Sequence, residues 1–144
     1  MAYLLDTNIF NQLVDNRISI DELPQDDSLL ATYLQIEEIN KTNNQNRKDE
    51  LLKKFHEVNP KRVPVETALF DATPWNEGKY GGDSELYKEL LIELDAMNNK
   101  KANNYADVLI AEVIIQNGHT LITADQDLAD LVENRNGKLI RFPA

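Results

Sequence analysis

Blocks of apolar residues alternate with polar segments along the chain, and their spacing predicts strands and helices in turn. Short segments rich in apolar and β-branched residues predict strands at residues 3–5, 29–33, 119–123 and 138–142. Apolar residues that recur every three or four positions predict helices near residues 9–14, 35–40, 45–57, 84–97, 105–116 and 125–132. This alternation predicts one α/β domain, residues 1–144, with a largely parallel central sheet flanked by helices.

Two segments fit this pattern less well. Residues 62–70 predict an extended segment, although Pro64 disfavours a central strand. Residues 71–82 are rich in glycine and aromatic residues and predict a loop.

The composition narrows the class of protein. The chain has no cysteine, which excludes disulfides, thiolate zinc sites and cysteine nucleophiles. The apolar run at residues 2–5 stops at Asp6, far short of a signal peptide, and no stretch has the ~18 apolar residues of a membrane span. We therefore expect a cytoplasmic protein with no membrane association.

Acidic side chains follow the predicted strands at several separate places. Asp6 follows the first strand directly, Glu37 and Glu38 follow the second, and Asp125 follows the strand that ends at Thr123. Asp127 lies two residues further on, and Asp107 lies in the first turn of the helix at 105–116. Since ligands of open α/β sheets bind beyond the carboxyl ends of the strands, these acids are expected to meet at one edge.

Such a cluster needs a compensating positive charge. Two carboxylates ~4 Å apart at an effective dielectric of ~20 repel by roughly 4 kcal/mol. Hard divalent cations prefer oxygen ligands, so the cluster predicts a Mg²⁺ or Mn²⁺ site. His56 and His119 both lie outside the cluster, which argues against a histidine-based zinc site.

Each acid also has an ordinary explanation. Asp6 and Asp125 are plausible helix N-caps, Asp107 suits the dipole of a first helical turn, and Glu38 suits a helix surface. The conjunction favours a site, because four such roles would not all require acids at one sheet edge.

The residues around these acids resemble the PIN-domain nuclease family. The resemblance lies in the segments 3–10 (YLLDTNIF), Thr32 to Ile39, 104–111 (NYADVLIA) and 121–128 (LITADQDL), whose order and spacing match across nearly the whole chain. It implies a parallel sheet flanked by helices and metal-dependent cleavage of RNA. It also implies a set of site residues: Asp6, Glu38, Asp107 and Asp125 as the acidic quartet, Asp127 as an accessory metal ligand, and Thr7, Asn8 and Thr123 as polar support.

The sequence departs from the family in three places. Gln35 stands where the family often has serine or threonine, and Glu37 adjoins Glu38; we favour Glu38 because Ile39 follows it, as the family's apolar residue usually does. The segment 60–85 is longer and richer in glycine than in the shortest relatives.

Charge and aromatic residues suggest where a phosphate backbone would bind. The net charge is −10, yet residues 41–62 carry seven lysines and arginines against three acids. This basic strip is either a solvated helix face or a phosphate-binding surface, and the loop 75–83 adds aromatic residues for base stacking. The weaker substrate-binding candidates are Lys41, Arg47, Lys48, Lys79 and Tyr80.

The sequence thus predicts a Mg²⁺- or Mn²⁺-dependent endoribonuclease. Many relatives are toxins of toxin–antitoxin pairs, so the resemblance implies an RNA substrate, an antitoxin partner and a homodimer. Two alternatives stay open: a non-catalytic PIN-like module that binds RNA or protein, and a phosphatase or phospho-acceptor domain with Asp6 as nucleophile. The second lacks an aspartate two residues after Asp6.

Overall fold

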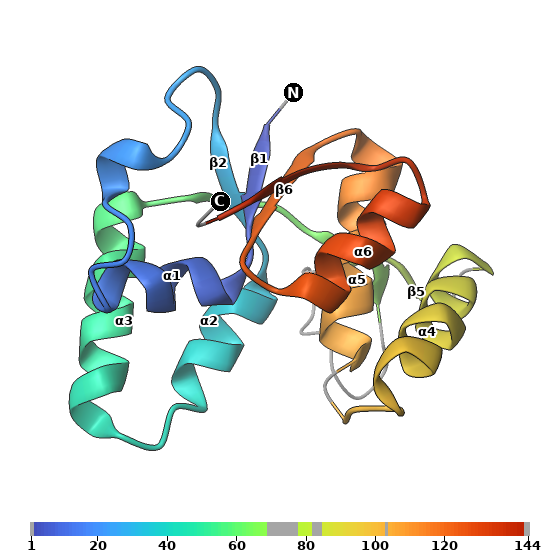
Figure 1. Ribbon diagram of the computed structural model, residues 1–144, viewed down its shortest axis with the longest axis horizontal. Coiled ribbons are helices and arrows are strands. Elements are labelled where there is room, and N and C mark those ends of the chain that lie inside the picture. The colour runs from blue at the N-terminus through green and yellow to red at the C-terminus, as the bar shows by residue number, and fades with distance from the viewer. Residues whose placement is uncertain (1, 69–77, 82–84, 103, 143–144) are drawn as a thin grey trace.

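A five-stranded parallel sheet forms the centre of the chain (Figure 1). The structure is a computed structural model that describes residues 2–68, 78–81, 85–102 and 104–142. The sheet has the order β3-β2-β1-β6-β7, and every pair of neighbouring strands is parallel. Its strands are β1 (Tyr3–Leu5), β2 (Leu29–Ala31), β3 (Lys61–Arg62), β6 (Thr120–Thr123) and β7 (Lys138–Arg141).

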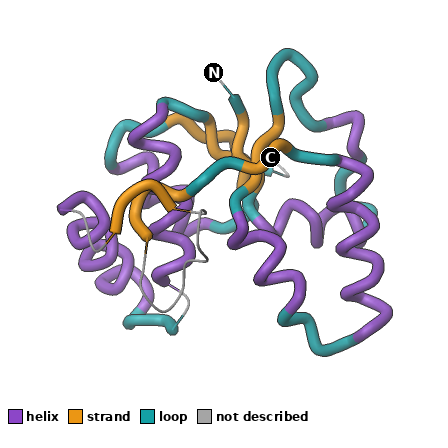
Figure 2. The backbone as a smooth tube through the Cα atoms, turned by 180° about the vertical axis from the view of Figure 1, so that it is seen from behind, coloured by secondary structure: helices purple, strands orange, loops and turns teal. Residues whose placement is uncertain are grey.

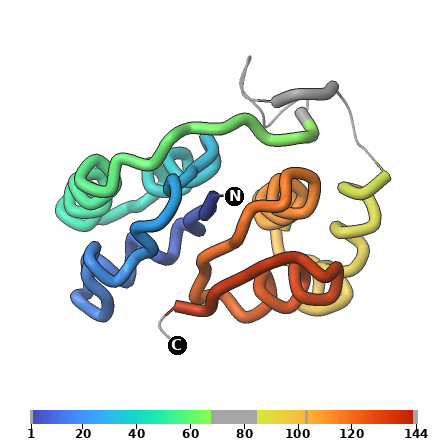
Figure 3. The backbone as a smooth tube through the Cα atoms, turned by 90° about the horizontal axis from the view of Figure 1, so that it is seen from above, coloured from blue at the N-terminus to red at the C-terminus, as the bar shows by residue number. Residues whose placement is uncertain are grey.

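Helices cover both faces of the sheet. They are α1 (Thr7–Val14), α2 (Tyr33–Asn40), α3 (Gln45–Val58), α4 (Glu85–Asn98), α5 (Asn104–Asn117) and α6 (Gln126–Asn134), with a 3₁₀ turn at Ile20–Glu22. Figure 3 shows α1–α3 and α4–α6 on opposite sides of the strands. None of the helices in the described ranges is long and apolar enough to span a membrane. The predicted α/β architecture is confirmed.

Two hydrophobic cores lie on the two faces, because successive residues of a strand point to opposite sides. In β1, Leu4 packs with the core that contains α4, α5 and α6, whereas Leu5 packs with Phe10 of α1 and Leu51 of α3. The apolar helix α5 is buried along most of its length, as a crossover helix must be. It ends before Gly118, whose φ of +68° is the left-handed conformation of a glycine C-cap.

One predicted boundary was wrong. The run at 29–33 was expected to be a strand throughout, but the strand ends at Ala31 and Tyr33 already begins α2. The Thr32 side chain accepts a hydrogen bond from the Leu34 N–H at 3.1 Å, and Gln35 completes a capping box. This cap outweighs the β-propensity of the threonine and tyrosine side chains.

A second, two-stranded sheet corrects the prediction of a loop at 71–82 for residues 78–81, and the rest of that predicted loop lies outside the described residues. Strand β4 (Val65–Ala68) pairs in parallel with β5 (Gly78–Gly81), and β4 packs beside α5 (Figure 2). The expected extended segment at 62–70 thus divides around Pro64 between β3 and β4. Residues 71–77 and the side chains of Lys79 and Tyr80 lie outside the described part of the structure. The role of Lys79 and Tyr80 in substrate binding therefore stays a prediction.

Candidate active site

The predicted acids gather in one pocket at the carboxyl ends of the strands. The pocket has a volume of about 270 Å³ and is lined by side chains from the β1–α1 turn, α2, α5 and the β6–α6 turn. Its acidic residues are Asp6, Glu37, Glu38, Asp107 and Asp125. The fold therefore brings together four carboxylates that are up to 119 residues apart in sequence, namely Asp6, Glu38, Asp107 and Asp125.

Asp6 lies at the centre of the hydrogen bonds that organise this edge. Only 5% of the residue is exposed. One carboxylate oxygen accepts from the Thr7 N–H at 2.8 Å and the other from the Thr123 hydroxyl at 2.8 Å. The Asp6 N–H donates to the Ile122 carbonyl at 3.0 Å. Asp6 is thus both the N-cap of α1 and a bridge between β1 and β6.

The turn after β6 is held by the predicted supporting residues. The Asp125 N–H donates to the Thr123 hydroxyl at 2.9 Å, and the Asn8 side-chain oxygen accepts from the Ala124 N–H at 3.1 Å. Asp125 itself caps α6, since its carboxylate accepts from the Leu128 N–H at 3.1 Å. Thr123 and Asn8 therefore fix the two strand ends that carry Asp6 and Asp125. The Thr7 hydroxyl is buried and has no hydrogen-bond partner among the described residues.

Asp107 reaches the pocket from the first turn of α5. The start of this helix is held by Asn104, which is 3% exposed and whose amide donates to Asp95 of α4 at 2.7 Å. Asn98 at the end of α4 also exchanges hydrogen bonds with Asn104 at 2.8 Å. Half-buried Asp107 has no hydrogen bond of its own within the described ranges, so its charge is poorly compensated.

The electrostatics of the site agree with this crowding of negative charge. Burial, aided by repulsion from Glu38 and Asp125, raises the pKa of Asp6 from 3.8 to about 7, despite the opposing hydrogen bond from Thr123. Burial and repulsion, above all from Asp6, raise the pKa of Asp107 to about 8. Asp6 and Asp107 thus resist ionisation mainly because they are buried, and the charges of the neighbouring acids add to the effect.

The structure favours Glu38 over Glu37 as the fourth member. Glu38 is exposed, yet its charge contributes to the raised pKa of both Asp6 and Asp107. Glu37 also lines the pocket but pairs with Lys41, one turn along α2, at 3.6 Å. Asp127 is not among the residues that line the pocket, although its charge raises the pKa of Asp107. It therefore lies at the margin of the cluster.

The donor set fits a hard divalent cation in chemistry. It consists of carboxylate oxygens from four elements, and a cation would relieve the repulsion that raises the pKa of Asp6 and Asp107. No three acidic or histidine side chains in the described ranges are already placed to hold a metal ion. Metal binding would thus require side-chain rotations that draw the acids closer together, for which the exposed Glu38 has the most freedom.

The basic residues that were predicted to bind substrate fall into two groups. Lys41 lines the acidic pocket and has a side chain that is 62% exposed, so it stays a candidate for phosphate binding, as does half-buried Lys48. Arg47 has a different role, because its guanidinium donates to Asn11 at 2.8 Å and to both carboxylate oxygens of Asp15. Arg47 therefore joins α3 to α1, and an RNA backbone would have to compete with these bonds.

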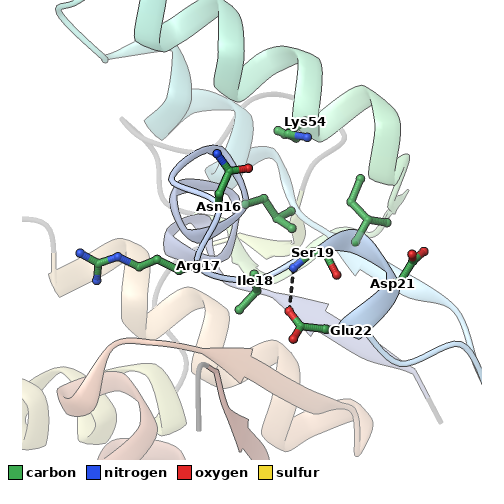
Figure 4. Close-up of a pocket in the computed structure, with 9 residues that line it drawn as sticks. Asn16, Arg17, Ile18, Ser19, Asp21, Glu22 and Lys54 are labelled. Atoms are coloured by element: carbon green, nitrogen blue, oxygen red, sulfur yellow. Dashed lines mark hydrogen bonds between the residues drawn. The ribbon is translucent and has the colours of Figure 1, made fainter.

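A larger pocket of about 410 Å³ lies at the far end of α1 and contains none of the clustered acids (Figure 4). It is formed by residues 16–22 together with Leu13 and Lys54. The Glu22 carboxylate accepts from the Ser19 N–H at 2.7 Å, which caps the 3₁₀ turn. The chemistry therefore points to the smaller, acidic pocket.

The sequence did not identify three residues that shape the site. Tyr105 lines the pocket beside Asp107, Asn104 anchors the start of α5, and Gln35 is fully buried between β1 and α2. For Asn104 and Gln35 the available signal was an amide side chain three residues before a predicted acidic site residue. That signal is weak, because amides are also common at helix ends and in turns.

Comparisons with known proteins extend the picture at the level of fold. No protein-family model and no curated protein matches the sequence. Among solved structures, the chain is similar to VapBC-5 of Mycobacterium tuberculosis, a member of the VapBC family of toxin–antitoxin systems, with a TM-score of 0.56 and 19% identity over 97% of this chain and 98% of that one.

Two further structures have the same fold. VapBC2 of Rickettsia felis, bound to a DNA fragment from its promoter, has a TM-score of 0.55 and 18% identity over 98% of each chain. A domain of a functionally unknown protein from Methanocaldococcus jannaschii has a TM-score of 0.53 and 16% identity over 99% of this chain and 91% of that chain. The expected PIN-type fold is therefore confirmed as an architecture that extends over almost the whole chain.

Proposed function

We propose that this chain is a Mg²⁺- or Mn²⁺-dependent endoribonuclease. The observation that carries the proposal is the acidic pocket, in which Asp6, Glu38, Asp107 and Asp125 converge from four separate elements at the carboxyl edge of a parallel sheet. The PIN-type fold supports the proposal, because the same residues match the acidic motifs of the family that the sequence resembles.

The four acids would hold the metal, and Asp127 would adjust their charge from the margin of the cluster. When bound, a divalent cation polarises a water molecule and neutralises charge that builds up on a phosphodiester. Asp6 is held by Thr7 and Thr123, and Asp125 by the cap of α6, so these two carboxylates are fixed in direction. Glu38, which is exposed and has more freedom, is suited to orient the attacking water.

The proposal includes the toxin role. VapBC-5 and VapBC2 belong to toxin–antitoxin systems, and the likeness covers nearly the full length of this chain. We infer that a partner antitoxin holds this nuclease inactive and that the chain forms a homodimer. Co-expression with the product of a neighbouring reading frame would test this role: the partner should co-purify and abolish cleavage, and free activity in its presence would argue against it.

The catalytic assignment is tested by cleavage of a mixed RNA pool in Mn²⁺. Asp6→Asn should abolish cleavage, because asparagine keeps the side-chain shape and the N-cap of α1 but provides no negatively charged oxygen to bind the metal. Asp21→Asn is the matched control, since Asp21 is exposed and lies on the other pocket. Circular dichroism should show that both variants fold.

Three outcomes would count against the assignment. Full cleavage by Asp6→Asn, in a preparation free of contaminating nuclease, would exclude Asp6 from catalysis. Tight Mn²⁺ binding by the wild type without cleavage of any RNA would favour the non-catalytic alternative. A stable acyl-phosphate on Asp6 after incubation with a small phosphodonor would favour the phosphatase alternative.

A further inference from the structure

Gln35 is a fully buried polar side chain near the acidic pocket, yet it does not line the pocket. The residue is 0% exposed and lies in the first turn of α2. Its amide nitrogen donates to the carbonyl of Leu5 at 2.7 Å, and its amide oxygen accepts from the N–H and the hydroxyl of Thr32 at 2.8 Å and 2.7 Å. One of these three hydrogen bonds therefore joins residues 30 positions apart, and the other two connect Gln35 to the start of its own helix.

The position of these bonds in the sheet gives them a specific consequence. Strands β1 and β2 are paired through Tyr3–Leu29 and Leu4–Leu30, after which β2 turns into α2. The Gln35 amide links the Thr32 N–H to the Leu5 carbonyl just beyond this last pair. The side-chain amide of Gln35 thus bridges the two strands one position beyond their last backbone pair, where the backbones separate.

The two ends that Gln35 joins each carry a pocket carboxylate. Leu5 immediately precedes Asp6. Gln35 precedes Glu38 by three residues, so Gln35 and Glu38 lie on one side of α2. Asp6 and Glu38 are both acids of one pocket and therefore push β1 and α2 apart. The Gln35 bond to Leu5 opposes that force.

We propose that Gln35 is a positioning residue that sets the separation of Asp6 and Glu38 across the β1–α2 junction and thereby tunes the metal site. On the other side of β1, the Thr123 hydroxyl sets Asp6 relative to Asp125. Asp6 is thus held from two directions, by Thr123 toward β6 and by Gln35 toward α2. This inference rests on the proposed metal-dependent function and assigns a role to a residue that departs from the serine or threonine common in the family.

A pair of variants separates positioning from simple helix capping. Gln35→Met keeps the volume but removes the bonds to both Leu5 and Thr32. Thr32→Val removes only the hydroxyl that caps α2, and it leaves the Thr32 N–H and the Gln35 bond to Leu5 in place. Each variant loses one half of the capping box: Gln35→Met loses the bond from the Thr32 N–H, and Thr32→Val loses the bond from the Leu34 N–H. A role confined to capping would therefore affect both variants to a similar degree.

The readout is Mn²⁺ binding, followed by the electron paramagnetic resonance signal of free Mn²⁺ at a temperature where all variants are folded. Gln35→Met should raise the Mn²⁺ dissociation constant by about 10- to 100-fold, the range seen when groups that orient metal ligands are removed. Thr32→Val should raise it less than about threefold, because the link between Leu5 and α2 survives. Raising the Mn²⁺ concentration should restore most of the cleavage by Gln35→Met.

Each outcome decides the question. Equal Mn²⁺ affinities for wild type and Gln35→Met, or equal losses in both variants, would overturn the positioning role and leave the proposed function intact. Absence of Mn²⁺ binding by the wild type would reject the proposed function and this inference together. Should Gln35→Met not fold, Gln35→Asn provides the same comparison, since its amide is one methylene too short to reach Leu5.

Discussion

Replacing Asp107 by asparagine should stabilise the metal-free protein at alkaline pH. Asp107 is half-buried at the start of α5, and it faces the charges of Asp6, Asp125, Glu38 and Asp127. Within the described part of the chain, no hydrogen bond to the Asp107 carboxylate stabilises its ionised form. Asparagine has nearly the same shape and no charge, so Asp107→Asn removes the electrostatic cost and leaves the packing in place.

The magnitude follows from the pKa. At about 1.36 kcal/mol per pKa unit, a pKa raised from 3.8 to about 8 corresponds to roughly 6 kcal/mol of unfavourable free energy when the folded protein is ionised. The asparagine amide still costs about 1–3 kcal/mol when it is buried without a partner. The net gain expected for Asp107→Asn is therefore about 3–5 kcal/mol at pH 8 and above.

The pH dependence has a definite sign. Between pH 3.8 and about 8 the folded protein keeps the Asp107 proton and the unfolded chain does not. The free energy of unfolding of the wild type therefore falls as pH rises through this window, by up to about 1.4 kcal/mol per pH unit from this group. The advantage of Asp107→Asn should be small near pH 4, grow toward pH 8 and then level off.

Urea unfolding in EDTA, measured from pH 5 to pH 9, checks this prediction, with Asp21→Asn as the exposed control. Adding Mg²⁺ at pH 8 should reduce the advantage of Asp107→Asn by about 2.7 kcal/mol, the stabilisation that a ligand at 100 times its dissociation constant gives the wild type. A variant that is no more stable than wild type at pH 8, or an advantage that does not change with pH, would show that Asp107 is not held against its charge.

Three further expectations concern the surroundings of the site. Thr123→Val removes the hydroxyl that donates to Asp6, so the pKa of Asp6 should rise by about one unit above 7. Carboxylate NMR measures this pKa, and an unchanged value would contradict the hydrogen bond. Arg47→Met should lower the melting temperature without changing Mn²⁺ affinity, because Arg47 joins α3 to Asp15; unchanged melting with weaker RNA binding would instead make it a substrate ligand. Lys41→Gln should weaken RNA binding and reduce its salt slope by about one, and an unchanged slope would exclude a phosphate contact by Lys41.

The sequence predicted the placement of the acids because that placement depends on a general property of parallel sheets. Residues that directly follow parallel strands must meet at one edge, whatever the loops between them do. Asp6 and Asp125 satisfy this rule as N-caps, and Asp107 satisfies it because a crossover helix begins at the same edge. The ordinary capping roles foreseen for Asp6 and Asp125 are real, and they are what points these carboxylates in a fixed direction.

Other features depended on contacts that no local pattern encodes. The pairing of β4 with β5 joins segments separated by residues 69–77, and the short strand at 78–81 has two glycines that argue against a strand. The bond from Gln35 to Leu5 spans 30 residues, so only the folded chain shows which carbonyl the amide reaches. Arg47 looked like part of a basic strip, yet its partners come from α1, which precedes it by more than 30 residues.

Together these features imply that the site is a source of instability which the surrounding backbone offsets. Two buried or half-buried carboxylates with raised pKa values disfavour the folded state at neutral pH. Against this, Asp6 caps α1 and Asp125 caps α6, and buried amides at Gln35 and Asn104 connect the elements that carry Glu38 and Asp107 to their neighbours. If this balance is correct, removing a buried amide such as Gln35 should weaken both stability and metal binding. Removing a charge such as that of Asp107 should weaken metal binding but raise the stability of the metal-free protein. The opposite responses of Gln35→Met and Asp107→Asn in EDTA would therefore distinguish a preorganised metal site from a set of acids that happens to share a surface.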